Sequence, residues 1–259
     1  MTRRAFVLLI LSLRSVTARA RSALRQPAYL LLDASTRRLD ARWDDPDRPL
    51  AVGSLIKPFT ALAYAGTHGF VYPTLVCRGS ADRCWLAGGH GRISMPEAVA
   101  GSCNAYFRQL AQWTSPDTLA TTLQWFGMRA DVREMTPEAM IGLGDGLKIA
   151  PAALIRAYLE LASRASQPGV SPVAQGMMES ARTGTGRAVG AAIGRTGAFV
   201  KTGTAPCSHS PKAGADGYTV AVYPADRPRV ALLVQAHGRT GAGTAEVAGG
   251  LLTSASEVR

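Results

Sequence analysis

Runs of apolar residues predict β-strands near both ends of the chain. The apolar run over Ala28–Asp33 is typical of a buried strand, and residues 38–43 are its predicted hairpin partner. A turn over residues 224–229 and a final helix from about Thr244 are also predicted. Three further β-rich runs lie towards the C-terminus, at residues 198–205, 217–223 and 230–236.

The middle of the chain shows helical periodicity instead. A helix is predicted over residues 54–65, with Pro58 tolerated because it falls in the first turn. Ser115 is a typical N-cap before Pro116 and Asp117, and Gly127 ends that helix. Apolar residues recur at helical spacing in two further stretches, Cys103, Tyr106, Phe107, Leu110 and Ala111, and then, after Pro151, Leu154, Ile155, Tyr158, Leu161 and Ala162.

Strands at both chain ends that flank a helical middle predict an α+β fold. The strands form one antiparallel sheet, with a helical subdomain inserted between them. The predicted sheet part covers residues 25–53 and 195–259, and the helical part covers residues 54–194. Together, residues 21–259 form one predicted catalytic domain, since the length suits a single domain with a packed core.

The first 20 residues are predicted to be an export signal. Arg3 and Arg4 precede an apolar run that is too short to span a bilayer, and Ala18-Arg19-Ala20 is a typical cleavage site. Either the twin-arginine or the general export route fits, and cleavage after Ala20 is favoured over a retained anchor. We therefore expect an exported protein, in the periplasm or at the cell surface.

Charge and cysteine content argue against nucleic-acid binding and against a metal cofactor. The formal net charge is +11, and it becomes +7 without the four arginines of residues 1–20. Because the arginines are scattered, nucleic-acid binding is not expected. Cys77 and Cys84 bracket a short polar loop and are the candidate disulfide of an exported protein, whereas Cys103 is interpreted as a small buried side chain. Closely spaced ligands such as C-x-x-C are lacking, so neither a metal nor another cofactor is expected.

Lysine is rare in this chain, which makes its positions informative. Of 29 basic residues only four are lysine, and two of these lie in S-L-I-K (Ser54–Lys57) and K-T-G-T (Lys201–Thr204). S-C-N (Ser102–Asn104) lies between them, so S-x-x-K, S-x-N and K-T-G occur in this order. A desolvated lysine can lose its proton and act as a base, whereas arginine stays charged. Each motif alone is weak, but the ordered set indicates acyl-transfer chemistry.

The three motifs supply complementary groups. Ser54 and Lys57 are three residues apart, so on a helix their side chains share a face. The Lys57 amine can then activate the Ser54 hydroxyl, provided that nearby positive charge, such as Lys201, lowers the pKa of Lys57. Ser102 can pass a proton to a leaving amine, and Asn104 can hold a substrate amide. Lys201 and Thr202 offer a cation and a hydroxyl to a substrate carboxylate. Finally, Gly203 leaves room for substrate, and the N–H groups of Ser54 and Thr204 form the predicted oxyanion hole.

Three stretches around the motifs resemble the transpeptidase domain of penicillin-binding proteins, in the serine β-lactamase superfamily. They are A-V-G-S-L-I-K-P-F-T-A-L, G-G-H-G-R-I-S-M-P-E-A-V-A-G-S-C-N-A-Y-F and I-G-L-G-D-G-L-K-I-A-P-A-A-L-I-R-A-Y. The resemblance implies a D,D-transpeptidase or D,D-carboxypeptidase that acts on peptidoglycan stem peptides and is inhibited by β-lactams, with cell-wall synthesis proteins as candidate partners. It implies that Ser54 is the nucleophile and Lys57 the base. Three departures from the family pattern are an expected bare catalytic domain, a short segment over residues 58–100, and I-G-L-G in place of the family's Ile-Gly-Gln-Gly.

Two rival functions stay open from the sequence. A serine β-lactamase would share the acylation step, and Glu138 follows Ser102 at a suggestive distance, although its surroundings do not match a water-activating loop. A non-catalytic penicillin-binding or partner-binding domain is the other rival, but no motif residue is missing. No histidine-based triad competes, because His68, His90, His209 and His237 lie in predicted loops or strand ends, where surface histidines are usual.

Overall fold

The computed structural model describes residues 26–131, 135–194, 197–207 and 214–257. The predicted export signal lies outside these residues. Within the described ranges, no helix combines the length and apolar character that a bilayer crossing requires.

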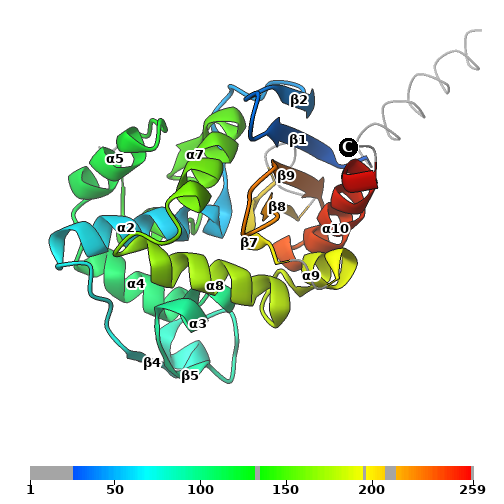
Figure 1. Cartoon of the computed structure of the whole chain (residues 1–259). Helices are drawn as coiled ribbons and strands as arrows, with labels where there is room; N and C mark the ends of the chain where they lie inside the picture. The colour runs from blue at the N-terminus through cyan, green and yellow to red at the C-terminus, as the bar shows by residue number, and fades with distance from the viewer. Residues whose placement is uncertain (1–25, 132–134, 195–196, 208–213, 258–259) are drawn as a thin grey trace, which may run out of the picture.

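A five-stranded antiparallel sheet forms the centre of the molecule (Figure 1). Its order is β2-β1-β9-β8-β7, so strands from the two ends of the chain pair directly, with Leu30 opposite Leu233. This pairing confirms the predicted sheet. The five strands are β1 (Ala28–Asp33), β2 (Leu39–Arg42), β7 (Phe199–Pro206), β8 (Ala215–Tyr223) and β9 (Val230–His237). Two small sheets pair β3 (Leu50–Ala51) with β6 (Lys148–Ile149) and β4 (Leu75–Cys77) with β5 (Gly91–Ile93).

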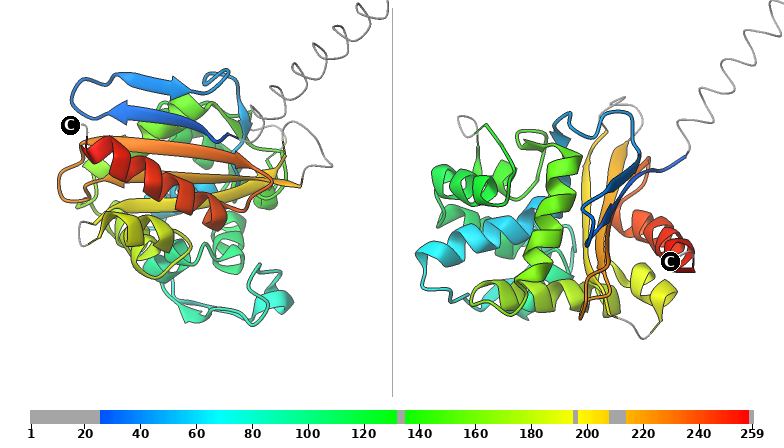
Figure 2. Two further views of the ribbon diagram at one scale, coloured as in Figure 1. Left: turned by 90° about the vertical axis from the view of Figure 1, so that its right-hand side faces the viewer. Right: turned by 45° about the horizontal axis from the view of Figure 1, so that its top comes forward.

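Helices cover both faces of this sheet, as the edge-on view of Figure 2 shows. The helices α9 (Arg187–Ile193) and α10 (Gly241–Glu257) pack on one face. The larger helical part lies on the other face and comprises α2 (Lys57–Thr67), α3 (Met95–Ala100), α4 (Asn104–Gln112), α5 (Pro116–Trp125), α6 (Pro137–Met140), α7 (Pro151–Ser163) and α8 (Val170–Arg182). Two short 3-10 helices, η1 (Gly53–Ile56) and η2 (Gly79–Asp82), complete the elements.

The central strands are buried on both faces because helices cover both. Along β9, Leu233 belongs to the core on the α7 side, whereas Leu232 and Val234 belong to the core under α10. A strand covered on both sides reads as a continuous apolar run, which explains why the sequence showed β-rich runs rather than strict alternation.

Local signals account for several helix boundaries, and the structure differs from the prediction in three respects. Ser115 caps α5 as predicted, since its hydroxyl accepts a hydrogen bond from the Thr118 N–H. The predicted helix at 54–65 is divided into η1 and α2, and Pro58 lies in the first turn of α2. Helix α8 was not predicted. Helix α9 lies on the α10 side of the sheet, although the predicted helical part includes its residues.

Candidate active site

Ser54 lies on η1, which packs directly on strand β7. Gly53 has φ of +58°, and a Cβ there would lie 2.4 Å from the carbonyl oxygen of Thr204. A Cβ on Gly203 would likewise lie 2.7 Å from the Val52 carbonyl oxygen. The two backbones can approach this closely only because both positions are glycine. On the other side, the Tyr158 hydroxyl of α7 donates a 2.6 Å hydrogen bond to the carbonyl of Leu55.

The glycine-rich I-G-L-G turn supports Ser54 from behind. Gly142 has φ of +77°, and a Cβ there would lie 2.0 Å from the carbonyl oxygen of Gly53 and 2.9 Å from the Ser54 nitrogen. The turn therefore fixes the peptide that precedes the predicted nucleophile. The next residue, Leu143, lines the same pocket as Ser54.

Lys57 begins α2, and its amine is completely buried. Its Nζ donates to the Ser102 carbonyl at 2.8 Å and to Asn104 Oδ1 at 2.6 Å, and it lies 3.4 Å from Ser102 Oγ. The ring of Phe107 lies 5.5 Å from the amine. The first motif is thus connected to the second through this one side chain.

Lys201 reaches the same hydroxyl from the sheet. Its Nζ donates to Ser102 Oγ at 2.8 Å and to the Thr202 carbonyl at 2.8 Å, and the side chain is fully buried. The sequence predicted a cation for a substrate carboxylate, but the structure directs this amine to Ser102. The hydroxyls that face the pocket at this edge are those of Thr202 and Thr185, joined by a 2.7 Å hydrogen bond.

Ser102 has an uncommon backbone conformation. Its φ is +50°, in the left-handed region that non-glycine residues rarely adopt. The carbonyl of Ser102 accepts hydrogen bonds from Lys57 Nζ and from the indole N–H of Trp85, the latter at 3.2 Å. Strained backbone is held in place by such surrounding contacts and is common at functional sites.

Burial lowers the pKa of both lysines. Desolvation brings the pKa of Lys57 to about 7, although the nearby Cys103 and Cys84 act in the opposite direction. Desolvation, assisted by the charge of Lys57, holds the pKa of Lys201 well below its usual range. The sequence attributed the lowered pKa of Lys57 to neighbouring positive charge, but the main cause is burial. A neutral amine at Lys57 is therefore accessible near neutral pH.

The motif residues enclose one pocket with a volume of about 400 Å³. Lys57 and Lys201 do not line this pocket, but both are buried and contact Ser102, which does. The sequence analysis did not predict five of the lining residues. Trp85, Thr185, Thr240 and Ala242 belong to no motif, and Leu143 was noted only as part of I-G-L-G. The pocket is lined by Ser54, Trp85, Ser102, Asn104, Leu143, Thr185, Thr202, Gly203, Thr204, Thr240 and Ala242.

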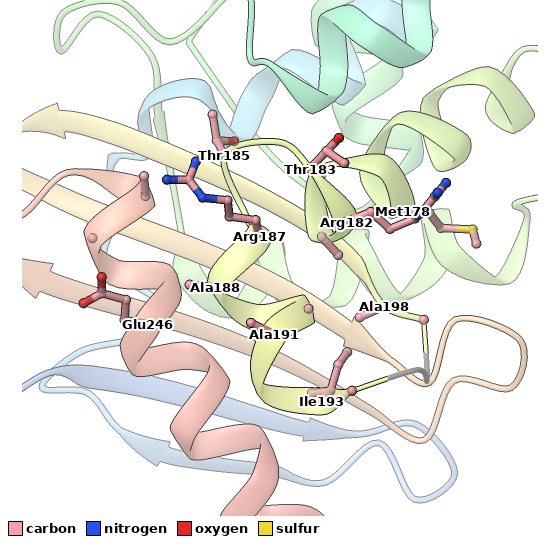
Figure 3. A pocket seen from close by; sticks show the side chains of 16 residues that line it. Met178, Arg182, Thr183, Thr185, Arg187, Ala188, Ala191, Ile193, Ala198 and Glu246 are labelled. Carbon is pink, nitrogen blue, oxygen red and sulfur yellow. The ribbon is translucent and has the colours of Figure 1, made fainter.

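A larger cavity of about 1080 Å³ adjoins this pocket at Thr185 and Ala242. Figure 3 shows Arg187 of α9 and Glu246 of α10 among its lining side chains. Thr185 lies in the segment that leads into α9 and belongs to both cavities. The larger cavity contains neither the serines nor the lysines of the motifs, so the candidate site is the smaller pocket that the motif residues line.

The structure also tests the candidate disulfide and locates Glu138. The candidate Cys77–Cys84 disulfide is not formed, since all four cysteines lie in the described part of the chain as free thiols. Glu138, whose sequence surroundings do not match a water-activating loop, forms ion pairs with Arg108, at 3.4 Å, and with Arg83, at 3.6 Å.

Two of the four histidines are not simple surface residues. His90 is half-buried beside the cysteines, and His237 contacts the buried Asp216 at 2.6 Å. His68 is exposed as predicted, and His209 lies outside the described residues.

The comparisons with known proteins agree with this geometry. The family model described as penicillin binding protein transpeptidase domain matches residues 46–253, which confirms the resemblance seen in the motifs. The chain is similar to a structure of Pseudomonas aeruginosa PBP2 in complex with WCK 5153, with 21% identity, TM-score 0.72 and coverage of 88% of this chain and 74% of that chain. It is also similar to Helicobacter pylori PBP2 in a complex with MreC, with 16% identity, TM-score 0.74 and coverage of 92% and 62%.

A third similar structure is PBPA from Mycobacterium tuberculosis, with 18% identity, TM-score 0.68 and coverage of 88% of this chain and 76% of that chain. At these identities the likeness establishes the fold alone. This chain spans less than two thirds of the Helicobacter protein in its complex. No curated protein matches the sequence at a significant level.

Proposed function

Because this chain belongs to the penicillin-binding protein transpeptidase family, we propose that it is an acyl-serine D,D-peptidase of peptidoglycan stem peptides. It either crosslinks stems as a D,D-transpeptidase or trims them as a D,D-carboxypeptidase. In both activities a serine ester forms with the stem, and β-lactams acylate the same serine.

The observation that carries this proposal is the convergence of two buried amines on one hydroxyl. Lys57 Nζ lies 3.4 Å and Lys201 Nζ 2.8 Å from Ser102 Oγ, and Ser102 lines the same pocket as Ser54. Structural lysines rarely lie fully buried without carboxylate partners, since desolvating an ammonium ion is costly. A proton-transfer network explains why the fold tolerates two of them side by side.

The hydrogen bonds of Lys57 suit a general base. A neutral amine has two N–H groups and one lone pair, and its two short bonds, to the Ser102 carbonyl and Asn104 Oδ1, occupy both N–H groups. The lone pair is then left to accept a hydroxyl proton. Because burial lowers the pKa of Lys57 to about 7, the neutral form is available near neutral pH.

Acylation would then proceed by a balanced exchange of bonds. Lys57 takes the proton of Ser54 Oγ while Oγ forms a bond to the carbonyl carbon of the penultimate D-alanine. The backbone N–H groups of Ser54 and Thr204 stabilise the oxyanion. The C–N bond to the terminal D-alanine breaks, and the leaving amine receives a proton through Ser102. Attack by an amine then completes transpeptidation, whereas attack by water completes hydrolysis.

The proposed setting is the cell-wall side of the membrane. The export-signal pattern of residues 1–20 supports secretion to the periplasm or cell surface. The partners proposed are stem peptides, β-lactams as inhibitors and proteins of cell-wall synthesis. The solved complex of Helicobacter pylori PBP2 with MreC supports cell-wall synthesis proteins as partners.

A time course of intact mass with benzylpenicillin tests the proposal. We expect a lasting adduct that maps to Ser54 and is lost in Ser54→Ala, while the exposed-serine control Ser80→Ala is labelled normally. A fleeting adduct with multiple turnover would instead indicate a β-lactamase. If the folded protein forms no adduct and does not cleave a D-Ala-D-Ala peptide, the proposed acyl-serine function is wrong.

A further inference from the structure

Three cysteines and one histidine meet next to the active site. Their ligand atoms, three Sγ and a ring nitrogen, all lie within 4.8 Å of one another. The residues come from separate places: strand β4, the turn after η2, the residue before β5 and the residue before α4. We call this group the cysteine-histidine cluster; it comprises Cys77, Cys84, His90 and Cys103.

The separations within the cluster match tetrahedral zinc. With Zn–S of about 2.3 Å and Zn–N of about 2.0 Å, a regular tetrahedron places its sulfurs roughly 3.8 Å apart and sulfur roughly 3.5 Å from nitrogen. In the structure, Cys84 Sγ lies 3.9 Å from Cys103 Sγ. His90 Nδ1 lies 3.5 Å from Cys77 Sγ and 3.6 Å from Cys84 Sγ.

We propose that the cysteine-histidine cluster binds one zinc ion through three thiolates and one imidazole. Binding releases the three thiol protons to solvent, and no other chemical change is needed. Thiolate ligands in a tetrahedral arrangement favour zinc over hard ions such as Mg²⁺ or Ca²⁺. With four protein ligands, the ion has no open position for substrate and serves a structural purpose.

The surroundings of the cluster fit metal ligands. The ring of His90 hydrogen-bonds to the backbone of Gly101. A Cβ on Gly101 would lie 2.9 Å from Nε2, which places that backbone at the far edge of the ring from Nδ1. Metal-bound histidines usually donate their second nitrogen in this way, which fixes the ring. At Cys103, the sulfur accepts the N–H of Tyr106 at 3.5 Å.

The position of Cys103 connects this site to the catalytic pocket. It lies between Ser102 and Asn104, whose side chains contact both buried lysines. Cys84 precedes Trp85, whose indole N–H donates to the carbonyls of Gly101 and Ser102. A bound ion would therefore hold the loop between β4 and β5 against the second motif and stabilise the unusual backbone of Ser102.

Metal content tests the site without reference to activity. The chain is purified in reducing buffer without chelator and analysed for metals, and we expect about one zinc per chain. Replacing zinc with Co²⁺ should give the thiolate charge-transfer band and the strong visible bands of tetrahedral cobalt. Cys77→Ser and His90→Ala should weaken zinc retention by more than the roughly 10–100-fold cost of losing an outer partner.

Cys207→Ser is the matched control. Cys207 lies outside the cluster and near Asp216 and His237, another group of metal-binding residue types, so this variant also tests whether zinc is held there. We expect Cys207→Ser to keep its zinc. The proposal is overturned if the folded chain takes up no zinc, if both ligand variants retain it unchanged, or if Cys77 and Cys84 form a disulfide that accounts for the missing metal.

The rate of benzylpenicillin labelling tests whether the zinc ion affects the pocket, and this test rests on the proposed acyl-serine function. Removal of zinc should slow labelling by benzylpenicillin, and added zinc should restore it, while Cys207→Ser is unaffected. Failure of labelling in zinc-loaded wild-type protein would count against the proposed function, whereas absence of zinc from a well-labelled protein would count against the metal site.

Discussion

The two walls of the candidate catalytic pocket are built from different parts of the chain. The wall that carries Ser54 is made of backbone against backbone, where Gly53, Gly142 and Gly203 allow three segments to touch. The wall that carries Ser102 and Asn104 is made of side-chain contacts, from the buried lysine amines, the Trp85 indole and the cysteine-histidine cluster.

The two walls should therefore respond to different kinds of substitution, one to added atoms and the other to changes of charge. On the Ser54 wall a single added carbon atom should disturb the fold, because backbone atoms cannot move aside. On the Ser102 wall the shape depends on which groups carry protons, so changes of charge should alter reactivity more than stability.

Replacing Lys57 by arginine should abolish most of the acylation. Arginine keeps a positive charge but cannot act as a base, and positioned bases contribute about 10²–10⁴-fold to rates. We therefore expect benzylpenicillin labelling of Lys57→Arg to slow by at least about 100-fold, measured by intact mass on protein whose folding is checked by circular dichroism.

The matched control for this prediction is Lys148→Arg. Lys148 is exposed, so the same substitution there leaves the pocket unchanged and labelling should stay at the wild-type rate. If Lys57→Arg were acylated at the rate of Lys148→Arg, the assignment of Lys57 as the base would be wrong.

On the backbone wall, Gly53→Ala should lower stability more than a similar change elsewhere. The alanine Cβ would lie 2.4 Å from the Thr204 oxygen and would also require φ of +58°. Overpacking and left-handed backbone together cost about 2–5 kcal/mol. With roughly 2–4 °C lost per kcal/mol, the melting temperature should fall by about 4–20 °C.

Gly69→Ala isolates the conformational part of that cost. Gly69 has φ of +62°, but no atom lies within 4 Å of its built Cβ. Its destabilisation should stay near the roughly 1–2 kcal/mol expected for left-handed backbone alone. Equal melting temperatures for the two variants would show that the contact between η1 and β7 adjusts easily.

The backbone wall was largely predictable from sequence, because its signals are local. The motifs identified Ser54 and K-T-G, and the β-rich runs located β7, whereas Gly203 was expected to leave room for substrate and in fact also faces the Val52 carbonyl. The sequence could not show that 54–65 would divide into η1 and α2, since the packing of η1 on β7 determines that boundary. Tertiary contacts of this kind outweigh helical propensity.

The side-chain wall was predicted only in part. Motifs identified Ser102 and Asn104, but Trp85 and Thr185 belong to no motif and reach the pocket through folding alone. The cysteine spacing did not suggest a metal site, because pairing of β4 with β5 and the turn at Gly79 bring distant ligands together. A usable signal was present, since three of the four cysteines and one histidine fall within residues 77–103.

The rate of acylation should depend on pH through Lys57. Burial lowers the pKa of Lys57 from 10.5 to about 7, so the amine is protonated and inactive below this pH and becomes a free base above it. The labelling rate should therefore rise by about tenfold between pH 6 and 8 and then level off. Stopped-time mass measurements with benzylpenicillin check this, and a rate that keeps rising towards pH 10 would indicate a base with an ordinary lysine pKa.

The smallest expected effect concerns Leu143, in the glycine-rich turn behind Ser54. Leu143 lines the pocket and follows Gly142, at the position where the family has glutamine in its Ile-Gly-Gln-Gly turn. A Leu143→Gln variant would add an amide that can hydrogen-bond to a stem peptide, and such a bond contributes about 0.5–1.5 kcal/mol. We expect kcat/KM for a D-Ala-D-Ala peptide to rise roughly two- to tenfold.

Leu143→Met separates this polar effect from a change of shape. Methionine keeps the pocket apolar with a similar volume, so its kcat/KM should stay close to the wild-type value. If both variants changed kcat/KM equally, the turn would act through packing against Gly53 alone. If only Leu143→Gln gained activity, the leucine would be a tuning position that lowers peptide recognition while leaving the serine and lysine chemistry intact.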